Sequence, residues 1–486
     1  PVPGYVGNPI PAPTLPVSNY AKIERAAGIT APDSAQVVAL PVVLDGRLVH
    51  DTADHYRFAA KKGEKVVIEV MSARLGSGLD SSLDILDADG GPLHNVKVRC
   101  VAQTVLTLAD RDSRSSGLRI EKWAHLAMND WIMVGSEILR VTKLPGYGDE
   151  DLLIYAFHTG QRRGYFGTTP EYHAVGQPIY KAQIHDPKDE FAPNGMPVFT
   201  IDWQNDDYQF DDEMSRDSRI DFDPPYDGEF IAVVRNSIMN DDNDHDYRFT
   251  VRPPEPDFAV FLGPARVNIA QGSRVPLDFR VQRYDEFDGE VSIHVEGLPE
   301  GLSIADEVVL AGHENAALTM AASDSAQSTP WADRYRVVAT GQINGKTATR
   351  ETHFYHATVV SRKADVVVKT NLTQLALEPG ESAWIEVELD RNNGFTSRVP
   401  IDALNLPFGV RVLDTGLNGI LVREDEYTRS MEIYAEPWVK PMSRTIYAQA
   451  RIESRSPGRM VFVSRPITLT IGGAGPALVA SASNSD

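Results

Sequence analysis

Apolar and polar residues alternate along most of this chain, in short runs that end at Gly, Pro, Asn or Asp. The clearest series lies between positions 42 and 91, where apolar residues recur at a spacing of two: Tyr56/Phe58, Val66/Ile68/Val70 and Leu83/Ile85. Successive side chains of a β-strand point to opposite faces, so this spacing predicts three or four strands with one buried face each. Turns between them are supplied by Lys62-Gly63 and Asp89-Gly90-Gly91. No long pattern with the helical period of 3.6 residues occurs, and we predict an all-β fold.

The same stretch carries short motifs that continue further along the chain. They are Asp54-x-Tyr56-x-Phe58, Lys62-Gly63, Arg74-Leu75-Gly76-Ser77, Leu83-x-Ile85-Leu86-Asp87, Asn205-Asp206-Asp207, Pro225-Tyr226-Asp227-Gly228-Glu229-Phe230 and Tyr247-Arg248-Phe249. Together they resemble the bacterial pre-peptidase C-terminal (PPC) domain, in the version found in large secreted proteins of planctomycete-type bacteria. The resemblance implies a jelly-roll-like β-sandwich. Because the closing motifs come more than a hundred residues late, we predict that residues 95–197 are an insertion into it.

An internal repeat predicts two further sandwiches. Residues 272–304 align without a gap on residues 380–412, at a constant offset of 108. The identical pairs are Arg283/Arg391, Phe287/Phe395, Val291/Val399, Ile293/Ile401, Leu298/Leu406, Pro299/Pro407 and Gly301/Gly409. A period of this length with alternating strands is typical of one immunoglobulin-like (Ig-like) domain. The Gly-Leu-Pro-x-Gly sequence at 297–301 also resembles bacterial Ig-like stalk modules.

These observations predict a multi-domain chain of β-sandwiches. Its parts are a Pro-rich N-terminal arm or linker (1–40), a PPC-like sandwich (41–94 plus 198–252), an inserted β-rich subdomain (95–197), a first Ig-like domain (258–361), a second Ig-like domain (365–473) and a flexible tail (474–486). Six prolines within the first sixteen residues favour extended conformations over a packed core, which is why the N-terminal part is assigned as an arm.

The inserted subdomain has β signals of its own. Residues 131–141 predict a hairpin in which Gly135 takes the first position of a type II′ turn. Residues 152–157 are continuously apolar, which predicts a strand buried on both faces. Arg162-Arg163 is the prominent basic pair of this part. A surface ion pair and docking onto an acidic neighbour are the two readings of this pair that stay open.

Negative charge is concentrated in one region. The formal net charge is −21, and residues 202–246 alone hold fifteen acidic and three basic residues. Nucleic acids and anionic membranes need a basic footprint, so they are excluded as expected partners. No apolar run reaches the length of a membrane span.

Two loops in this acidic region are candidate calcium sites. Calcium takes six to eight oxygen ligands, and loops dense in Asp and Asn provide them. The candidate ligands are Asp206, Asp207, Asp212 and Asp217 in the first loop and Asp242, Asp244 and Asp246 in the second. The second loop begins like an EF-hand, but Tyr247 replaces the required Gly and Pro253 the required Glu. Solvated surface loops without metal are the alternative.

No motif for catalysis is present. The chain has no His-Glu-x-x-His, no Gly-x-Ser-x-Gly, no Walker loop and no dinucleotide fingerprint. His353 and His356 are three residues apart in a predicted strand and therefore on opposite faces, which disfavours a shared metal. Trp123, Trp131 and Trp203 are candidates for a glycan-stacking platform, with structural packing as the alternative. Cys100 is the only cysteine, which rules out an intrachain disulfide.

We therefore predict a non-enzymatic, secreted or cell-surface protein with a structural or adhesive role, located extracellularly, at the cell surface or in the periplasm. Its expected partners are other extracellular or envelope proteins, or further copies of itself, with a glycan as another candidate. Two alternatives remain: a non-catalytic accessory region of a larger secreted hydrolase or peptidase, which the PPC resemblance implies, and a subunit of an extracellular or envelope assembly. The chain begins at Pro1 without a signal peptide, so we expect it to be processed or to be a fragment.

Overall fold

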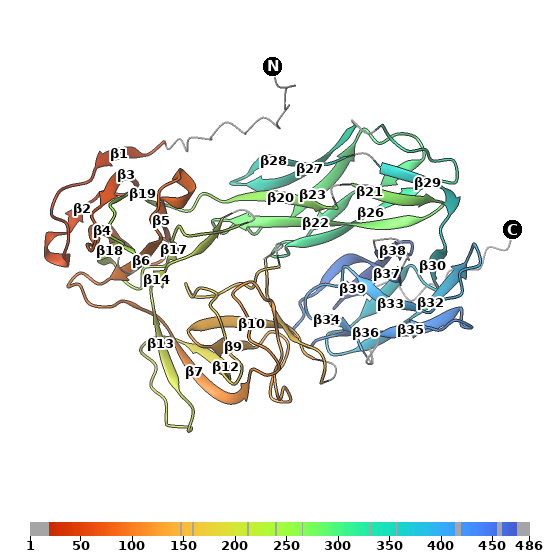
Figure 1. Cartoon of the computed structure of the whole chain (residues 1–486), viewed down its shortest axis with the longest axis horizontal. Helices are drawn as coiled ribbons and strands as arrows, with labels where there is room; N and C mark the ends of the chain where they lie inside the picture. The colour runs from red at the N-terminus through yellow and green to blue at the C-terminus, as the bar shows by residue number, and fades with distance from the viewer. Residues whose placement is uncertain are drawn as a thin grey trace, which may run out of the picture. The chain divides into compact units, whose positions relative to one another are not determined.

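The computed structural model confirms the all-β, multi-sandwich fold class. It describes residues 19–145, 148–157, 160–210, 213–238, 241–264, 266–330, 333–355, 357–413, 419–453 and 459–473. In these residues the regular elements are β-strands and two 3-10 turns, η1 (Pro32–Ser34) and η2 (Ala73–Leu75) (Figure 1). The chain forms two compact units, Pro1–Asn95 with Ile201–Phe210 and Met214–Pro254, and Val96–Thr200 with Asp211–Glu213 and Glu255–Asp486. The predicted tail at 474–486 lies outside the described residues.

The first unit is a sandwich of two five-stranded sheets. One sheet has the order β1 (Ala21–Glu24), β3 (Val42–Leu48), β19 (His245–Arg252), β5 (Val66–Met71) and β17 (Arg219–Phe222). The other has the order β14 (Gln204–Asn205), β6 (Ser81–Leu86), β18 (Gly228–Asn236), β4 (Asp54–Ala60) and β2 (Gln36–Val37). The apolar residues spaced by two in the sequence, among them Tyr56, Phe58 and Ile68, meet in one core between the sheets.

The N-terminal segment differs from its predicted role as an arm. β1 pairs in parallel with β3, and β2 pairs in parallel with β4, so residues 21–37 cover an edge of each sheet. Ile29 and Val38 are buried in the sandwich core. Arg25 donates two hydrogen bonds to the buried carboxylate of Asp54, at 2.6 and 2.5 Å. The prolines that suggested an arm are confined to residues 1–16, outside the described residues, whereas the segment after them carries apolar anchors.

The inserted subdomain is built on one seven-stranded sheet. Its order is β13 (Val198–Asp202), β7 (His94–Val105), β12 (Pro178–His185), β9 (Trp131–Val134), β10 (Glu137–Lys143), β11 (Leu152–Ile154) and β8 (Gly117–Leu118). β9 and β10 form a hairpin in which Val134 faces Glu137 and Gly135 has φ of 59°. The prediction that residues 152–157 are buried on both faces is wrong. β11 spans only three residues, and Leu153 is 38 % exposed because it points away from the core.

The second unit also contains the two Ig-like sandwiches. In the first sandwich, one sheet has the order β20 (Asp257–Gly263), β22 (Arg274–Tyr284), β26 (Asn315–Ala322) and β24 (Leu302–Ile304). The other sheet has the order β25 (Glu307–Val309), β23 (Val291–Glu296), β27 (Arg334–Ile343) and β28 (Lys346–Tyr355). In addition, β21 (Val267–Gln271) pairs in parallel with β29 (Ala357–Lys363). In the second sandwich, one sheet has the order β30 (Val366–Thr370), β32 (Ser382–Arg391), β36 (Thr428–Ala435) and β34 (Val410–Val412). The other sheet has the order β31 (Gln374–Leu377), β39 (Ile467–Ile471), β37 (Met442–Glu453), β33 (Val399–Leu404) and β35 (Ile420–Val422), and β38 (Arg459–Val463) also pairs with β37. Each sandwich has its own apolar core.

The repeated residues perform the same task in both copies. The guanidinium of Arg283 lies 5.2 Å from the Phe287 ring centroid, and that of Arg391 lies 5.7 Å from the Phe395 ring centroid. Arg283 also donates to the carbonyl groups of neighbouring loops at Gly289 (2.6 Å), Leu310 (3.0 Å) and His313 (2.9 Å). Arg391 donates likewise to the carbonyls of Ser397 and Arg423, both at 2.6 Å. One arginine thus ties several loops together at the same end of each sandwich.

The next residues of the repeat hold the segment that leads into each copy. Asp285 and Asn393 occupy equivalent positions and share a left-handed backbone, with φ of 48° and 54°. The Asp285 carboxylate accepts a hydrogen bond from the Glu255 amide at 2.8 Å. The Asn393 amide donates to the Lys363 carbonyl at 2.9 Å. Residues Glu255 and Lys363 are also 108 positions apart, so the repeat includes the hydrogen bond that holds the incoming linker to each copy.

Candidate functional site at the acidic end of the first sandwich

The strand pairing of the first sandwich gathers four loops at one end. Leu48 at the end of β3 faces His245 at the start of β19, and Asn236 at the end of β18 faces Ser81 at the start of β6. Loops 49–53 and 72–80 and the described residues of 206–218 and 237–244 therefore lie at this end, which we call the acidic end. Segment 206–218 also contains the paired strands β15 (Tyr208–Phe210) and β16 (Glu213–Ser215). The chain leaves towards the insertion after β6 and towards the Ig-like domains after β19, in both cases from the opposite end. Both predicted acidic loops thus meet where no connection to another domain leaves the sandwich.

Asp217 of the first acidic loop is a structural residue. Its side chain is fully buried, and it accepts hydrogen bonds from the Ser72 amide at 2.8 Å, the Ala73 amide at 2.7 Å and Arg74 Nε at 2.7 Å. Donors of the protein thus occupy the lone pairs of both carboxylate oxygens, and the carboxylate fastens turn η2. The assignment of Asp217 as a calcium ligand is therefore corrected. Asp212 lies outside the described residues.

Like charges lie near two further carboxylates at the acidic end, Asp207 of this loop and Asp80 of loop 72–80. Burial, together with the negative charges of Asp206 and Asp80, raises the pKa of Asp207 to about 7. The pKa of Asp80 is raised too, by burial and by Asp206 and Asp217, and the cation of Arg216 only partly offsets this. Like charges near one another disfavour ionisation. This part of the acidic end would therefore gain stability from a proton or another cation.

The second acidic loop is organised by Asp241, which was not among the candidate ligands. His245 Nε2 lies 2.6 Å from Asp241 Oδ2, Asn236 Nδ2 donates to the same oxygen at 3.0 Å, and Asn243 Nδ2 donates to Oδ1 at 2.8 Å. These partners, His245 first and then Asn243, lower the pKa of Asp241. The His245 ring packs so closely on Gly78 that a Cβ there would lie 2.8 Å from its Cε1 atom.

The predicted ligands of the second loop do not converge. Asp244 accepts a hydrogen bond from the His50 amide at 3.0 Å and lies 3.5 Å from Arg47, which also reaches Asp246 at 3.6 Å. Asp242 is exposed to solvent. Over the described part of the chain, no group of three or more His, Cys, Asp or Glu side chains is arranged to hold a metal ion. The Asp242-Asp244-Asp246 spacing failed as a signal because Asp242 and Asp244 lie in the loop before β19, whereas Asp246 belongs to that strand and pairs with Arg47.

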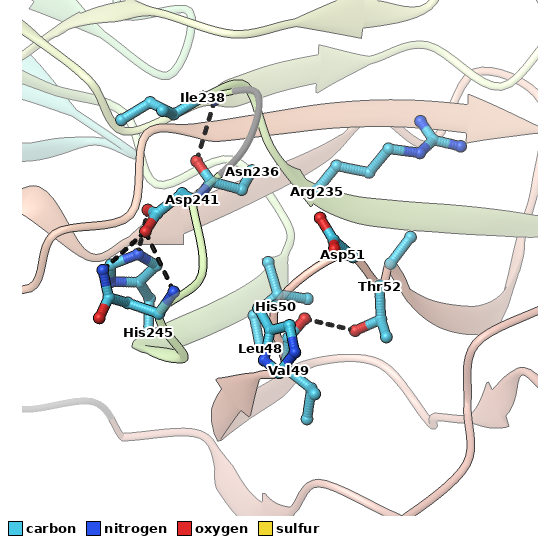
Figure 2. A pocket seen from close by; sticks show the side chains of 12 residues that line it. Leu48, Val49, His50, Asp51, Thr52, Arg235, Asn236, Ile238, Asp241 and His245 are labelled. Carbon is cyan, nitrogen blue, oxygen red and sulfur yellow. Dashed lines mark hydrogen bonds and ion pairs between the residues drawn. The ribbon is translucent and has the colours of Figure 1, made fainter.

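A pocket of about 290 Å³ opens between loops 49–53 and 237–244 (Figure 2). Figure 2 shows Asp241 and His245 on one side, and Asp51 and Thr52 on the other. The lining residues are Leu48, Val49, His50, Asp51, Thr52, Ala53, Arg235, Asn236, Ile238, Asp241, Asn243 and His245. They include no Ser or Cys nucleophile, and the Thr52 hydroxyl donates to the Val49 carbonyl at 2.6 Å.

Charged side chains in the cores form closed structural networks. In the first sandwich, Asp54 accepts from Arg25 and, at 2.6 Å, from the Tyr247 hydroxyl. In the insertion, fully buried Arg162 donates two hydrogen bonds to fully buried Glu137, at 2.8 and 2.7 Å. Burial alone would raise the pKa of Glu137, but Arg162 and His173 hold it below its usual value. The interpretation of the Arg162-Arg163 pair as a surface ion pair is therefore wrong for Arg162, whose side chain is fully buried.

The three candidate tryptophans are packed inside their own domains. The Trp131 ring lies 4.9 Å from the Tyr165 ring, and Arg140 lies 4.8 Å above it. Trp203 packs edge-on against Phe222 at 5.2 Å, and Trp123 packs against the core of the insertion. We find no platform formed by these rings in the described residues, because neighbouring aromatic and cationic side chains contact them. His356 of the histidine pair lies outside the described residues.

Comparison with known proteins assigns no family to this chain. No protein-family model matches the chain, so the PPC resemblance has no support from such a match. No curated protein matches either. Among solved structures, a chimeric titin Z1Z2 is 16 % identical (45 % of this chain and 98 % of that chain; TM-score 0.15), and domains 4–9 of the surface layer protein SbsC are 13 % identical (48 % and 34 %; TM-score 0.21). Fibronectin(III)-like modules of Clostridium thermocellum CbhA are 15 % identical (44 % and 92 %; TM-score 0.15). The strand pairing described above shows a multi-domain all-β protein built of β-sandwiches. No helix that could cross a membrane occurs in the residues described above.

Proposed function

We propose that this chain is a non-enzymatic structural or adhesive protein of the cell exterior, and that its first sandwich presents the acidic end to a partner. One observation carries the proposal. Both acidic loops and the 290 Å³ pocket share the end of the sandwich from which no connection to another domain leaves. Loops held at the free end of a rigid sandwich are a common binding surface.

The chemistry of this end favours a cationic partner. Residues 202–246 carry fifteen acidic and three basic residues, and Asp207 and Asp80 lie in an environment that disfavours their ionisation. A divalent cation such as calcium, or a basic protein surface, would relieve that repulsion. We also propose that the first sandwich is a PPC-like domain. Two alternative roles follow: an accessory region of a larger secreted hydrolase, and a subunit of an envelope assembly.

The rest of the chain supports a scaffold role. In both Ig-like copies a loop residue fastens the incoming linker, Asp285 at Glu255 and Asn393 at Lys363. The buried charged networks lie inside domain cores and contact no cavity described above. Each of these hydrogen bonds joins a linker residue to the Ig-like copy that follows it, which suits a spacer built of successive modules.

The test is size-exclusion chromatography with light scattering on the full chain, in calcium and again in chelator. The expected result is a calcium-dependent oligomer, or a basic protein partner that is retained in chelator and released by calcium, and Asp207→Asn abolishes either. The matched control is Asp221→Asn, which changes an exposed carboxylate paired with Arg219. The same elution in both buffers, with no basic partner retained, would contradict the proposal.

A further inference from the structure

One corner of the first Ig-like sandwich contacts two other domains of the second unit through adjacent residues. Arg163 of the insertion forms an ion pair with Glu314 and donates a hydrogen bond to its Oε1 atom at 2.8 Å. The next residue, Asn315, accepts hydrogen bonds from Arg444 of the second Ig-like sandwich, at 2.7 Å on both its carbonyl and its side-chain oxygen. The insertion and the second Ig-like copy therefore meet the first copy at the same point.

A loop of the second Ig-like sandwich makes the complementary pair of contacts. The Asn405 side-chain oxygen accepts a hydrogen bond from Arg444. Three residues later, the Phe408 ring lies 5.0 Å from the ring of Tyr155 in the insertion and 5.0 Å from the ring of Trp438 in its own domain. We call the set of Tyr155, Arg163, Glu314, Asn315, Asn405, Phe408 and Arg444 the junction.

Arg444 is the buried residue of the junction. Arg444 is 6 % exposed, and burial lowers its pKa to about 10. A buried cation is tolerated only when its donors are satisfied, and the partners of this one come from two domains. Next to it, Ala317 of the first copy packs in an apolar cluster with Tyr447 and Val463 of the second. On the side of the insertion, burial raises the pKa values of Tyr155 and Tyr165.

The two copies differ at the positions that reach the junction, although the residues beside them are identical. The first copy has Gly297-Leu298-Pro299-Glu300-Gly301 where the second has Asn405-Leu406-Pro407-Phe408-Gly409. Both loops have the same backbone, with φ of 79° and 67° at the first position and 88° and 89° at the last. The turn itself therefore needs neither Asn405 nor Phe408. These two side chains serve a purpose found only in the second copy.

We propose that the inserted subdomain is an internal bracket, which docks on both Ig-like copies through the junction and fixes their relative geometry. The Arg162-Arg163 pair of the sequence then has two roles: Arg162 holds the core of the insertion, and Arg163 docks on the acidic Glu314 of a neighbouring domain. The bracket is independent of the acidic end and of any partner bound there.

The experiment is differential scanning calorimetry on the full chain and on a loop exchange, Asn405→Gly with Phe408→Glu. This exchange gives the second copy the residues that the first copy carries in the same turn, so the loop retains a sequence known to fold this way. The bracket predicts that the insertion and both Ig-like copies of the wild-type chain unfold in one transition. In the exchanged chain this transition splits, and small-angle X-ray scattering shows a larger radius of gyration.

Two control variants change matched groups away from the junction. Trp384→Ala removes an aromatic ring that is 56 % exposed on the second copy, and Arg336→Gln removes an exposed ion pair within the first copy. Both should retain the single transition. The proposal would be overturned by separate transitions in the wild-type chain, or by a loop exchange whose calorimetric trace and scattering match those of the controls.

Discussion

At the scale of single residues, the acidic side chains of this protein divide into those held by several hydrogen-bond donors and those that face mainly like charges. Asp217 and Asp207 are ten residues apart in one acidic stretch. Asp217 accepts several hydrogen bonds from turn η2, whereas Asp207 faces the like charges of Asp206 and Asp80. The first stabilises the sandwich in its ionised form and the second destabilises it. The contrast leads to a pH prediction.

The Asp207→Asn variant should be more stable than the wild type above pH 7 and equally stable near pH 4. In the folded chain the pKa of Asp207 is raised to about 7, so the folded state holds a proton that the unfolded state releases from about pH 4 upwards. Wild-type stability therefore falls as the pH rises through this window. With solvent screening we expect a difference of about 1–2 kcal/mol, measured by urea unfolding at several pH values. A difference that does not change with pH would contradict this assignment.

Arg25 should be among the most sensitive residues of the first sandwich. Replacing it by Met leaves the buried Asp54 carboxylate without its cation, which costs about 3–5 kcal/mol for a buried pair. The control is Lys22→Met, which removes an exposed pair with Asp45 and should cost less than about 1 kcal/mol. Chemical denaturation of the full chain measures both. Equal effects would mean that the N-terminal segment is not anchored through Arg25.

At the scale of elements, the repeat shows which positions the Ig-like turn requires. Gly301 and Gly409 both have left-handed backbones, and a Cβ at Gly301 would lie 2.9 Å from the Ala326 Cα atom. Gly345 also has a positive φ, but nothing lies within 4 Å of its Cβ position. The two glycines of the first copy therefore separate backbone strain from steric clash.

Gly345→Ala should cost about 1–2 kcal/mol, which is the strain of an L-residue in the left-handed region. Gly301→Ala should cost more, about 3 kcal/mol or above, because the backbone of Ala326 must also move. The measurement is the unfolding free energy of both variants in the full chain. Equal costs would show that the loop after β26 yields without penalty.

At the scale of the whole molecule, the two compact units should respond to different changes. Calcium and Arg25→Met act on the first unit, and Gly301→Ala acts on the second. In calorimetry, calcium should raise the unfolding temperature of the first unit alone, because a ligand that binds only the folded state stabilises what it binds. A shift confined to the second unit, or no shift at any calcium concentration, would exclude the acidic end as a calcium site.

The sequence alone determined the strands that show clear alternation, because alternation at a spacing of two is a local property of each segment. It also determined the Ig-like repeat, whose identical Arg283 and Arg391 make equivalent contacts. It did not determine β1 and β2, which were assigned to an arm, or the short extent of β11. Only the tertiary structure decided what the charged residues do. Asp217 and Asp207, or Arg162 and Arg163, are alike in sequence, but distant segments give them different surroundings. Asp217 and Arg162 anchor their domains from inside, whereas Asp207 faces like charges and Arg163 pairs with Glu314 of another domain. Those partners lie up to 151 residues away, a distance over which no local pattern carries information.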